Sequence, residues 1–234
     1  DFNIKINSAA NWFELSGDIE ISAKKKMKIA ELVEKAAQSK GNFIQLSDNE
    51  YVRLTAELRR HIDLLGRIAS VARGKMKVSQ FNAPMLETLN ESGMTLDTDK
   101  AYSNLIERII NSDNAEIKIP KTINADLRNY QKEGFIWMSR LALWGAGALL
   151  ADDMGLGKTL QAIALLLSRA HKGPQLIVVP TSVVMNWRDE IARFAPSLSV
   201  KILNTPGDDR NTIICKAKTF DIVIITYGLL SIEE

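Results

Sequence analysis

The sequence has few of the residues that mark a secreted or a membrane protein. Cys215 is the only cysteine, so a disulfide framework is excluded and a cysteine-based metal site is disfavoured. We interpret Cys215 as a small apolar filler on a helix. No run of about 18 apolar residues could cross a membrane, and Asp1-Phe2-Asn3 does not open a signal peptide. We therefore expect a cytoplasmic protein.

An excess of charge of one sign is also missing. The chain has 30 Lys and Arg residues against 28 Asp and Glu residues, a net charge of +2. This balance does not indicate a polyanion partner, but it does not exclude one, because basic groups can gather in one groove. The hydrophobic fraction of 46% and the charged fraction of 25% are those of an ordinary globular protein.

A boundary between two regions is predicted within residues 111–124, which are polar, include Pro120 and lack helical periodicity. Residues 1–115 are predicted to form an α+β accessory region. Its predicted elements are a hairpin of 13–15 and 19–21 around Ser16-Gly17-Asp18, a helix over 27–37, a hairpin of 43–46 and 51–54, and helices at 55–72, 83–91 and 99–111.

Residues 116–234 show a regular alternation of strands and helices. The predicted strands are 147–151, 175–179, 200–203 and 221–226, and the predicted helices are 125–143, one from Lys158, 183–194 and 208–218. Such an alternation is typical of βαβ units in an α/β fold with a parallel sheet. Ligands of these sheets bind beyond the carboxyl ends of the strands.

A phosphate-binding loop is predicted at residues 152–159, Asp-Asp-Met-Gly-Leu-Gly-Lys-Thr, between an apolar strand and a helix. Gly155 and Gly157 let the main chain approach a phosphate, and the N–H groups at the helix start point at the anion. Lys158 offers a positive charge to the β- and γ-phosphates, and the Thr159 hydroxyl can bind Mg²⁺. We therefore predict ATP and Mg²⁺ as ligands.

One residue departs from the general pattern of such loops, Gly-x-x-x-x-Gly-Lys-Ser/Thr, because Asp152 stands where the first glycine is expected. The alternative interpretation is a glycine-rich turn between a strand and a helix that carries a surface lysine. The strand, both glycines, the Lys-Thr pair and the helix together favour the phosphate loop.

Four motifs in order resemble those of the Swi/Snf ATPases of helicase superfamily two. They are the upstream glutamine motif at 127–134, the first motif at 150–161, motif Ia at 179–182 with Asn186-Trp187, and motif Ib at 221–227. In that family an acidic residue at position 152 is usual. The resemblance covers about 120–234 and implies the first part of a RecA-like ATPase lobe.

The resemblance implies a role for each site residue. Gln131 would pair with the adenine edge, although a helix cap is the alternative. The remaining nucleotide-binding residues would be Asp153, Met154, Gly155, Leu156, Gly157, Lys158 and Thr159, of which Lys158 and Thr159 are catalytic and Thr159 binds Mg²⁺. Nucleic acid would contact Pro180, Thr181, Ser182, Thr226 and Tyr227. For Thr181 and Ser182 the alternative is helix capping, and for Tyr227 it is packing.

The function implied is a bacterial, nucleoid-associated ATPase that translocates on double-stranded DNA. The chain ends at 231–234 before the Asp-Glu-x-His-like motif and the second lobe of this superfamily, so we expect these residues to bind ATP-Mg and to hydrolyse it poorly alone. Residues 1–120 resemble the accessory region of bacterial members through Trp12-Phe13-Glu14-Leu15 and the segment 46–54. Residues 1–115 could bind a protein partner. A phosphate-loop NTPase with a non-nucleic-acid substrate, or a partner-recruiting module, are the alternatives.

Overall fold

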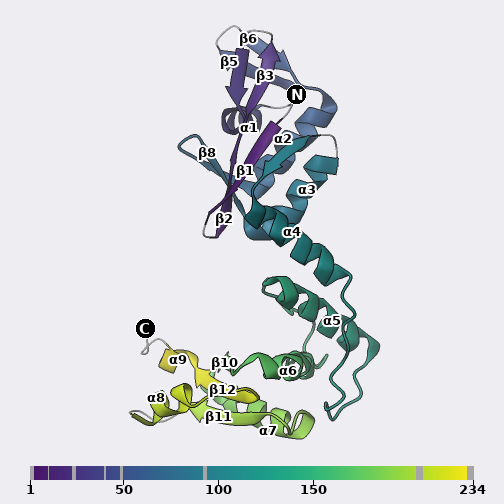
Figure 1. Ribbon diagram of the computed structural model, residues 1–234, viewed down its shortest axis with the longest axis vertical. Helices are drawn as coiled ribbons and strands as arrows, with labels where there is room; N and C mark the ends of the chain where they lie inside the picture. The colour runs from purple at the N-terminus through teal and green to yellow at the C-terminus, as the bar shows by residue number, and fades with distance from the viewer. Residues whose placement is uncertain are drawn as a thin grey trace. The chain divides into compact units, whose positions relative to one another are not determined.

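The computed structural model describes residues 3–9, 11–22, 25–39, 41–47, 50–91, 94–203 and 208–230 (Figure 1). The chain separates into two compact units, residues 1–113 and residues 114–234. Asp48 and Asn49 of the second predicted hairpin, and the final residues 231–234, lie outside the described residues.

A five-stranded sheet forms the centre of the first unit. Its strand order is β7 (Ala69–Ala72), β8 (Lys75–Ser79), β2 (Trp12–Ser16), β1 (Asn3–Ser8) and β9 (Thr95–Thr98). Only β1 and β9 run parallel within this sheet. Buried and exposed residues alternate along β1 and β2, so one face of the sheet is core and the other faces solvent.

Helix α4 (Lys100–Asp113) packs on the core face of this sheet, and α3 (Ala83–Glu91) packs against α4. The ring of Tyr102 on α4 meets the ring of Phe13 on β2 edge to face, with ring centres 5.0 Å apart. Asp99 begins α4 by accepting a hydrogen bond from the Tyr102 N–H at 2.9 Å, and its carboxylate also accepts one from the Ser8 hydroxyl at 2.8 Å. Asp99 therefore joins α4 to β1.

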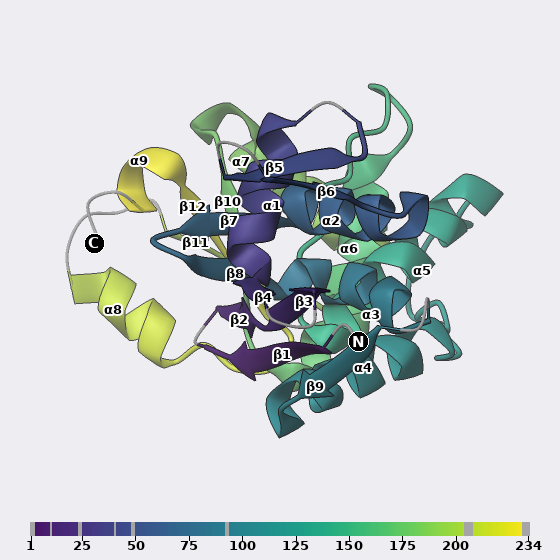
Figure 2. The ribbon, with the colours of Figure 1, turned by 90° about the horizontal axis from the view of Figure 1, so that it is seen from above.

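The rest of the first unit consists of two helices and two hairpins. Helices α1 (Ile29–Gln38) and α2 (Ala56–Ile68) lie side by side in both views (Figures 1 and 2). The hairpins pair β3 (Asp18–Ser22) with β4 (Lys25–Lys28), and β5 (Phe43–Ser47) with β6 (Glu50–Arg53). A 3₁₀ turn, η1 (Gln80–Asn82), precedes α3.

The structure confirms some of the predicted elements of this unit and corrects others. The β5–β6 hairpin and helices α3 and α4 are confirmed. The first predicted hairpin is wrong, because β2 pairs with β1 and β8, whereas β3 pairs with β4. A Cβ on Gly17 would clash with the Asn3 carbonyl oxygen. The chain between β2 and β3 therefore passes close to the start of β1. The helix predicted over 55–72 ends at Ile68, and β7 follows it.

The second unit is an α/β fold around a parallel sheet. The strand order is β10 (Gln175–Val179), β12 (Asp221–Thr226) and β11 (Ser199–Leu203). The helices are α5 (Asn129–Trp144), α6 (Lys158–Arg169), α7 (Val184–Phe194), α8 (Asp208–Cys215) and α9 (Tyr227–Leu230). Two 3₁₀ turns, η2 (Ala170–Lys172) and η3 (Thr181–Val183), follow α6 and precede α7. Three of the four predicted strands of this unit and the helix from Lys158 are therefore confirmed.

Helices α6 and α7 pack against the sheet in one core. Ile163 of α6, Ile191 of α7 and Ile222 of β12 are fully buried in it. Each such side chain stabilises the fold by about 1.5–3 kcal/mol relative to an exposed one. Trp187 packs against the same core, which agrees with an anchoring role for that side chain.

The predicted strand at 147–151 is wrong. This segment has no ladder partner among the described residues, and Leu149 is 84% exposed. An extended segment becomes a strand only when a neighbour pairs with its backbone, and β10 to β12 pair only with one another.

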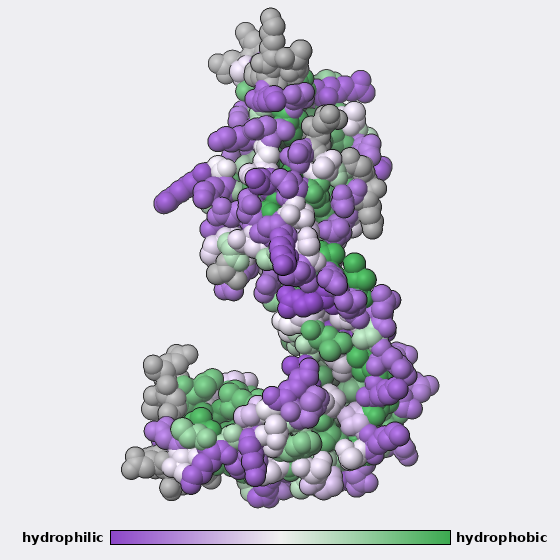
Figure 3. Space-filling model, in the orientation of Figure 1, coloured by the Kyte–Doolittle hydropathy of each residue, from purple (hydrophilic) through white to green (hydrophobic). Residues whose placement is uncertain are grey.

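Hydrophobic residues also reach the surface over β10 and β12 (Figure 3), where Leu176 is 55% exposed.

One further interpretation needs correction. Cys215 lies on α8 as expected but is exposed rather than buried. Trp137 on α5 is 43% exposed, although apolar residues surround it in the sequence. None of the helices in the described part of the chain is long and apolar enough to span a membrane.

Candidate nucleotide and nucleic-acid site

The predicted phosphate loop forms a turn that ends at the start of α6. Gly155 and Gly157 have φ angles of 86° and 72°, in the left-handed region that favours glycine. Gly157 is the N-cap of α6, and no side chain within the described ranges caps this end. The first N–H groups of the helix are therefore left for another acceptor, as an anion site requires.

Lys158 is held by the loop itself. Its Nζ donates hydrogen bonds to the carbonyl oxygens of Asp152 at 2.6 Å and Asp153 at 2.9 Å. The ammonium group is thus turned back over the loop, where it partly neutralises the carbonyl dipoles. Met154 at the tip is 97% exposed, so the loop is open to solvent on its outer side.

Gln131 connects α5 to this loop. Its side chain is 6% exposed; its Oε1 accepts a hydrogen bond from the Arg128 N–H at 2.9 Å, and its Nε2 donates one to the Leu156 carbonyl oxygen at 3.1 Å. A Cβ on Gly157 would lie 2.5 Å from that Nε2. The helix-cap interpretation of Gln131 is therefore confirmed, and the same amide also holds the loop.

A second glutamine makes the reverse contact from α6 to α5. Gln161 is fully buried, and a Cβ on Gly134 would clash with its Oε1. The two helices thus interlock, with Gln131 of α5 over Gly157 and Gln161 of α6 over Gly134. A side chain at either glycine would have to displace the opposing amide.

The strand ends that the motifs placed on nucleic acid lie at one edge of the sheet. Val179 and Thr226 are register partners in the parallel strands β10 and β12, so the residues that follow them leave the sheet side by side. Pro180, Thr181 and Ser182 are exposed, and Tyr227 is 61% exposed. Neither η3 nor α7 has a side-chain cap, so Thr181 and Ser182 do not cap these helices. The exposure of Tyr227 likewise argues against packing.

Comparison with known proteins places these motifs in a family. Residues 130–234 match the SNF2-related domain, and residues 1–120 match the bacterial SNF2 helicase-associated domain. The chain belongs to the SNF2 family. The accessory region of this SNF2 chain, which the sequence only suggested, is therefore identified as well.

Several relatives agree with this assignment. The chain is 30% identical to the putative ATP-dependent helicase/translocase YwqA of Bacillus subtilis over 94% of its own length and 25% of that protein. It is 31% identical to the chromatin-remodeling ATPase INO80 of Gibberella zeae over 69% of its length and 9% of that protein. The SNF2 chain thus spans about a quarter or less of these relatives.

Two solved structures are similar to this chain. The SWI2/SNF2 ATPase core of Sulfolobus solfataricus in complex with dsDNA is 42% identical over 50% of this chain and 24% of that chain, with a TM-score of 0.43. The UvsW helicase of bacteriophage T4 is 12% identical over 98% of this chain and 76% of that one, with a TM-score of 0.45.

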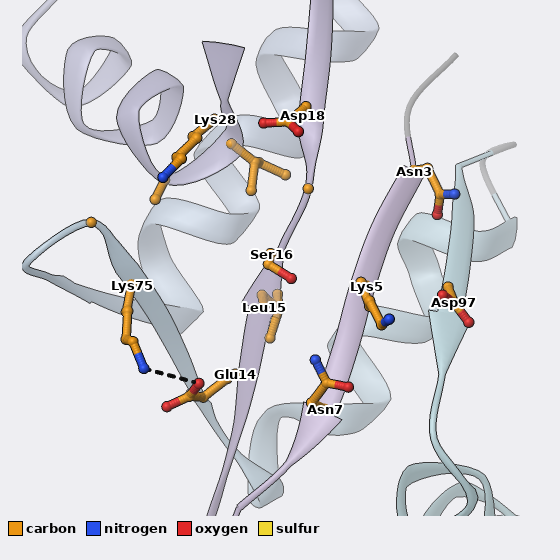
Figure 4. Close-up of a pocket in the computed structure, with 14 residues that line it drawn as sticks. Asn3, Lys5, Asn7, Glu14, Leu15, Ser16, Asp18, Lys28, Lys75 and Asp97 are labelled. Atoms are coloured by element: carbon orange, nitrogen blue, oxygen red, sulfur yellow. Dashed lines mark ion pairs between the residues drawn. The ribbon is translucent and has the colours of Figure 1, made fainter. Parts of the chain in front are cut away.

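Among the cavities lined by the described residues of the SNF2 chain, one borders the phosphate loop and another lies on the sheet of the first unit. The first, of about 530 Å³, is lined by Tyr130, Trp137 and residues 149–152 among others. The second, of about 570 Å³, lies on the solvent face of the first unit's sheet (Figure 4). There Lys5 and Asn7 of β1 stand between Asp97 of β9 and Glu14 of β2. Glu14 forms an ion pair with Lys75 at 3.5 Å.

Sequence reasoning missed the contact of Gln161 with Gly134, although both residues stood within the quoted motifs. Two signals could have revealed it. Gln161 interrupts the apolar run from Leu160 to Leu167, and a glycine inside a helix often marks the close approach of another group.

Proposed function

We propose that this chain is the nucleotide-binding front end of an ATP-driven motor that translocates on double-stranded DNA. The observation that carries the proposal is the phosphate loop, which combines two left-handed glycines, an uncapped helix start and the Lys158 ammonium. This combination would suit an anion beside a positive charge, as a bound triphosphate needs. Such a motor would work in the bacterial cytoplasm, on the nucleoid.

The loop residues fit ATP and Mg²⁺ by their chemistry. When bound, Mg²⁺ would supply positive charge that neutralises the phosphates. On binding, Lys158 would exchange the Asp152 and Asp153 carbonyl oxygens for phosphate oxygens. The main-chain N–H groups of 153–158 would hold the phosphates, and the Thr159 hydroxyl would bind the metal.

Gln131 is proposed to contact the adenine edge in addition to its present contacts. An amide side chain offers two N–H donors and two acceptor lone pairs. The described hydrogen bonds use one donor, to Leu156, and one acceptor lone pair, from Arg128. One donor and one acceptor remain for the base, so adenine recognition does not require the loop contact to break.

The edge formed by Pro180–Ser182 and Thr226–Tyr227 is proposed to grip one strand of the duplex. Exposed hydroxyls and strand-end N–H groups are typical donors to DNA phosphates, and such contacts position a protein on the duplex without reading sequence. Because the two segments are neighbours through the register of Val179 with Thr226, they could contact consecutive phosphates of the same strand.

We also propose that these 234 residues hydrolyse ATP poorly by themselves. Their Asp-Glu pair, Asp189-Glu190, lies on α7, not at the end of a strand where it could hold Mg²⁺. Arginine donated to the γ-phosphate from another part of the protein can be worth about 10³–10⁵ in rate.

The test is the ATPase rate of a full-length protein that contains this sequence, with and without double-stranded DNA. We expect strong stimulation by DNA that is lost in Lys158→Ala and kept in Lys172→Ala, a matched exposed lysine of η2. An ATPase rate that DNA does not change, but that Lys158→Ala abolishes, would support the phosphate loop and indicate a non-nucleic-acid substrate.

A second role is proposed for residues 1–115, the binding of a protein partner. The solvent face of their sheet carries Lys5 and Lys75 together with Glu14 and Asp97. This mixture of charges suits a protein surface better than a polyanion. If a protein is captured by the intact chain, we expect Lys5→Glu to release it, whereas Lys118→Glu in the second unit should not.

A further inference from the structure

The side chain of Gln161 occupies an unusual environment. It is fully buried on α6, and neither its Nε2 nor its Oε1 has a hydrogen-bond partner among the described residues. A buried amide without partners lowers the stability of a fold, whereas an apolar side chain of the same size would not. Such groups are tolerated mainly where function needs them.

The location of Gln161 connects it to the nucleotide site. Its N–H bonds to the carbonyl oxygen of Gly157 at 3.2 Å, so Gln161 stands one helical turn after the N-cap of α6. Its side chain contacts Gly134, which lies three residues after Gln131 on α5. The contact of Gln131 with Gly157 and that of Gln161 with Gly134 therefore form two ends of one interface between α5 and α6.

We propose that Gln161 is a positioning residue of the phosphate loop whose amide gains its hydrogen-bond partners when nucleotide binds. In the free chain the unpaired amide keeps the α5–α6 interface less stable than it could be. Gln131 and Gln161 both lie in the α5–α6 interface, so a shift of the loop or of Gln131 on binding changes the surroundings of the Gln161 amide. Nucleotide binding is then favoured by the pairing of this amide.

This inference rests on the proposed nucleotide site, and the experiment separates the two. The substitution Gln161→Met keeps the length and approximate volume of the side chain and removes both polar ends. Equilibrium unfolding by urea gives the stability of the free chain, and titration with Mg-ATP gives the Kd. The loss of one net hydrogen bond in the bound state corresponds to an increase in Kd of about fivefold.

The matched control is Gln175→Met. Gln175 is half-buried at the start of β10, and its Nε2 donates to the Leu166 carbonyl oxygen at 2.8 Å. This amide already has its partner and lies away from the loop. We expect the opposite pattern from it, a lower stability and an unchanged Kd for ATP.

For Gln161→Met we expect a free-chain stability equal to or above that of the wild type, together with the weaker binding of Mg-ATP. If the Kd is unchanged while the wild type binds ATP, Gln161 is only a core residue and the inference is wrong. A clear drop in free-chain stability would also overturn it, because the amide would then be paired without nucleotide. A wild-type chain that does not bind ATP would instead overturn the proposed nucleotide site itself, and the inference with it.

Discussion

The Nε2 of Gln131 on α5 donates a hydrogen bond to the carbonyl oxygen of Leu156 in the phosphate loop, at 3.1 Å. The two residues are 25 positions apart in the sequence, yet this contact makes the helix and the loop a single assembly. Because a base would be read from α5 and phosphates held by the loop, their separation is set before any ligand arrives. Preorganisation of this kind lowers the cost of binding.

The glycine at the end of the loop provides a first prediction. Gly157→Ala places a side chain in left-handed backbone and against Gln131, whereas Gly145→Ala has similar backbone with nothing within 4 Å of the added Cβ. The backbone alone costs about 1–2 kcal/mol in either variant. We expect urea unfolding to show a larger loss for Gly157→Ala, and titration to show loss of ATP binding only there. Equal losses would mean that the contact with Gln131 contributes nothing.

The glycine on α5 provides a second prediction. In a helix interior, replacing glycine by alanine normally stabilises by about 0.5–1 kcal/mol. We expect that gain for Gly66→Ala on α2, where the added Cβ meets only a Val33 methyl at 3.6 Å. For Gly134→Ala we expect a loss, because the Cβ would collide with the buried Gln161 amide. Thermal unfolding of both variants measures whether each substitution raises or lowers the stability. A higher stability of Gly134→Ala would contradict the interlock of α5 and α6.

The start of β12 provides a prediction on acid stability. The Lys201 ammonium, 2.7 Å away, and the Lys218 N–H, 2.9 Å away, hold the pKa of the buried Asp221 carboxyl below its ordinary value. Because the pKa of Asp221 is lowered in the folded state, its ionised carboxylate stabilises the fold fully above the pKa of the unfolded state, about 3.9. This stabilisation is lost as the pH falls through the lower pKa of the folded state.

We expect Asp221→Asn to lower the unfolding free energy by about 2 kcal/mol at pH 7, because a charged hydrogen bond is lost. The difference from wild type should shrink as the pH falls below about 4. Urea unfolding between pH 7 and pH 3 measures it. A difference that stays constant over this range would show that the charge of Asp221 is not its source.

The start of α4 provides a prediction for the first unit. The pKa of Asp99 is lowered chiefly by the Tyr102 N–H, with burial opposing and Ser8 assisting. Removing such a helix cap costs about 1–2 kcal/mol. We expect Asp99→Ala to lose at least that much stability, and Asp97→Ala on the exposed side of β9 to lose little. Comparable losses in denaturant unfolding would rule out the link between α4 and β1.

The strand edge provides a prediction about DNA. Thr226→Val keeps the shape of a half-buried residue and removes the hydroxyl proposed to contact a phosphate. In the full-length protein we expect the DNA concentration for half-maximal ATPase stimulation to rise about threefold to tenfold, the worth of about one hydrogen bond. Thr95→Val on β9, also on a strand, is the control. An unchanged midpoint would remove Thr226 from the DNA contact.

Much of the second unit could be predicted because its signals are local. The loop needs glycine at φ angles of 72° and 86°, a lysine and a helix start, and all of these are adjacent in sequence. The strands β10, β11 and β12 are short apolar runs with clear ends, so their bounds followed within a residue. The family resemblance rested on the same contiguous motifs.

The sequence by itself thus determined the family, the phosphate loop and the α/β alternation, since each depends on neighbouring residues. Only the tertiary structure decided which strands pair, that residues 147–151 find no partner within the described chain, and that Gln131 and Gln161 each face a glycine of the opposite helix. Those features depend on contacts between segments far apart in the chain. The free energy of such contacts is set by packing, which local propensity does not encode.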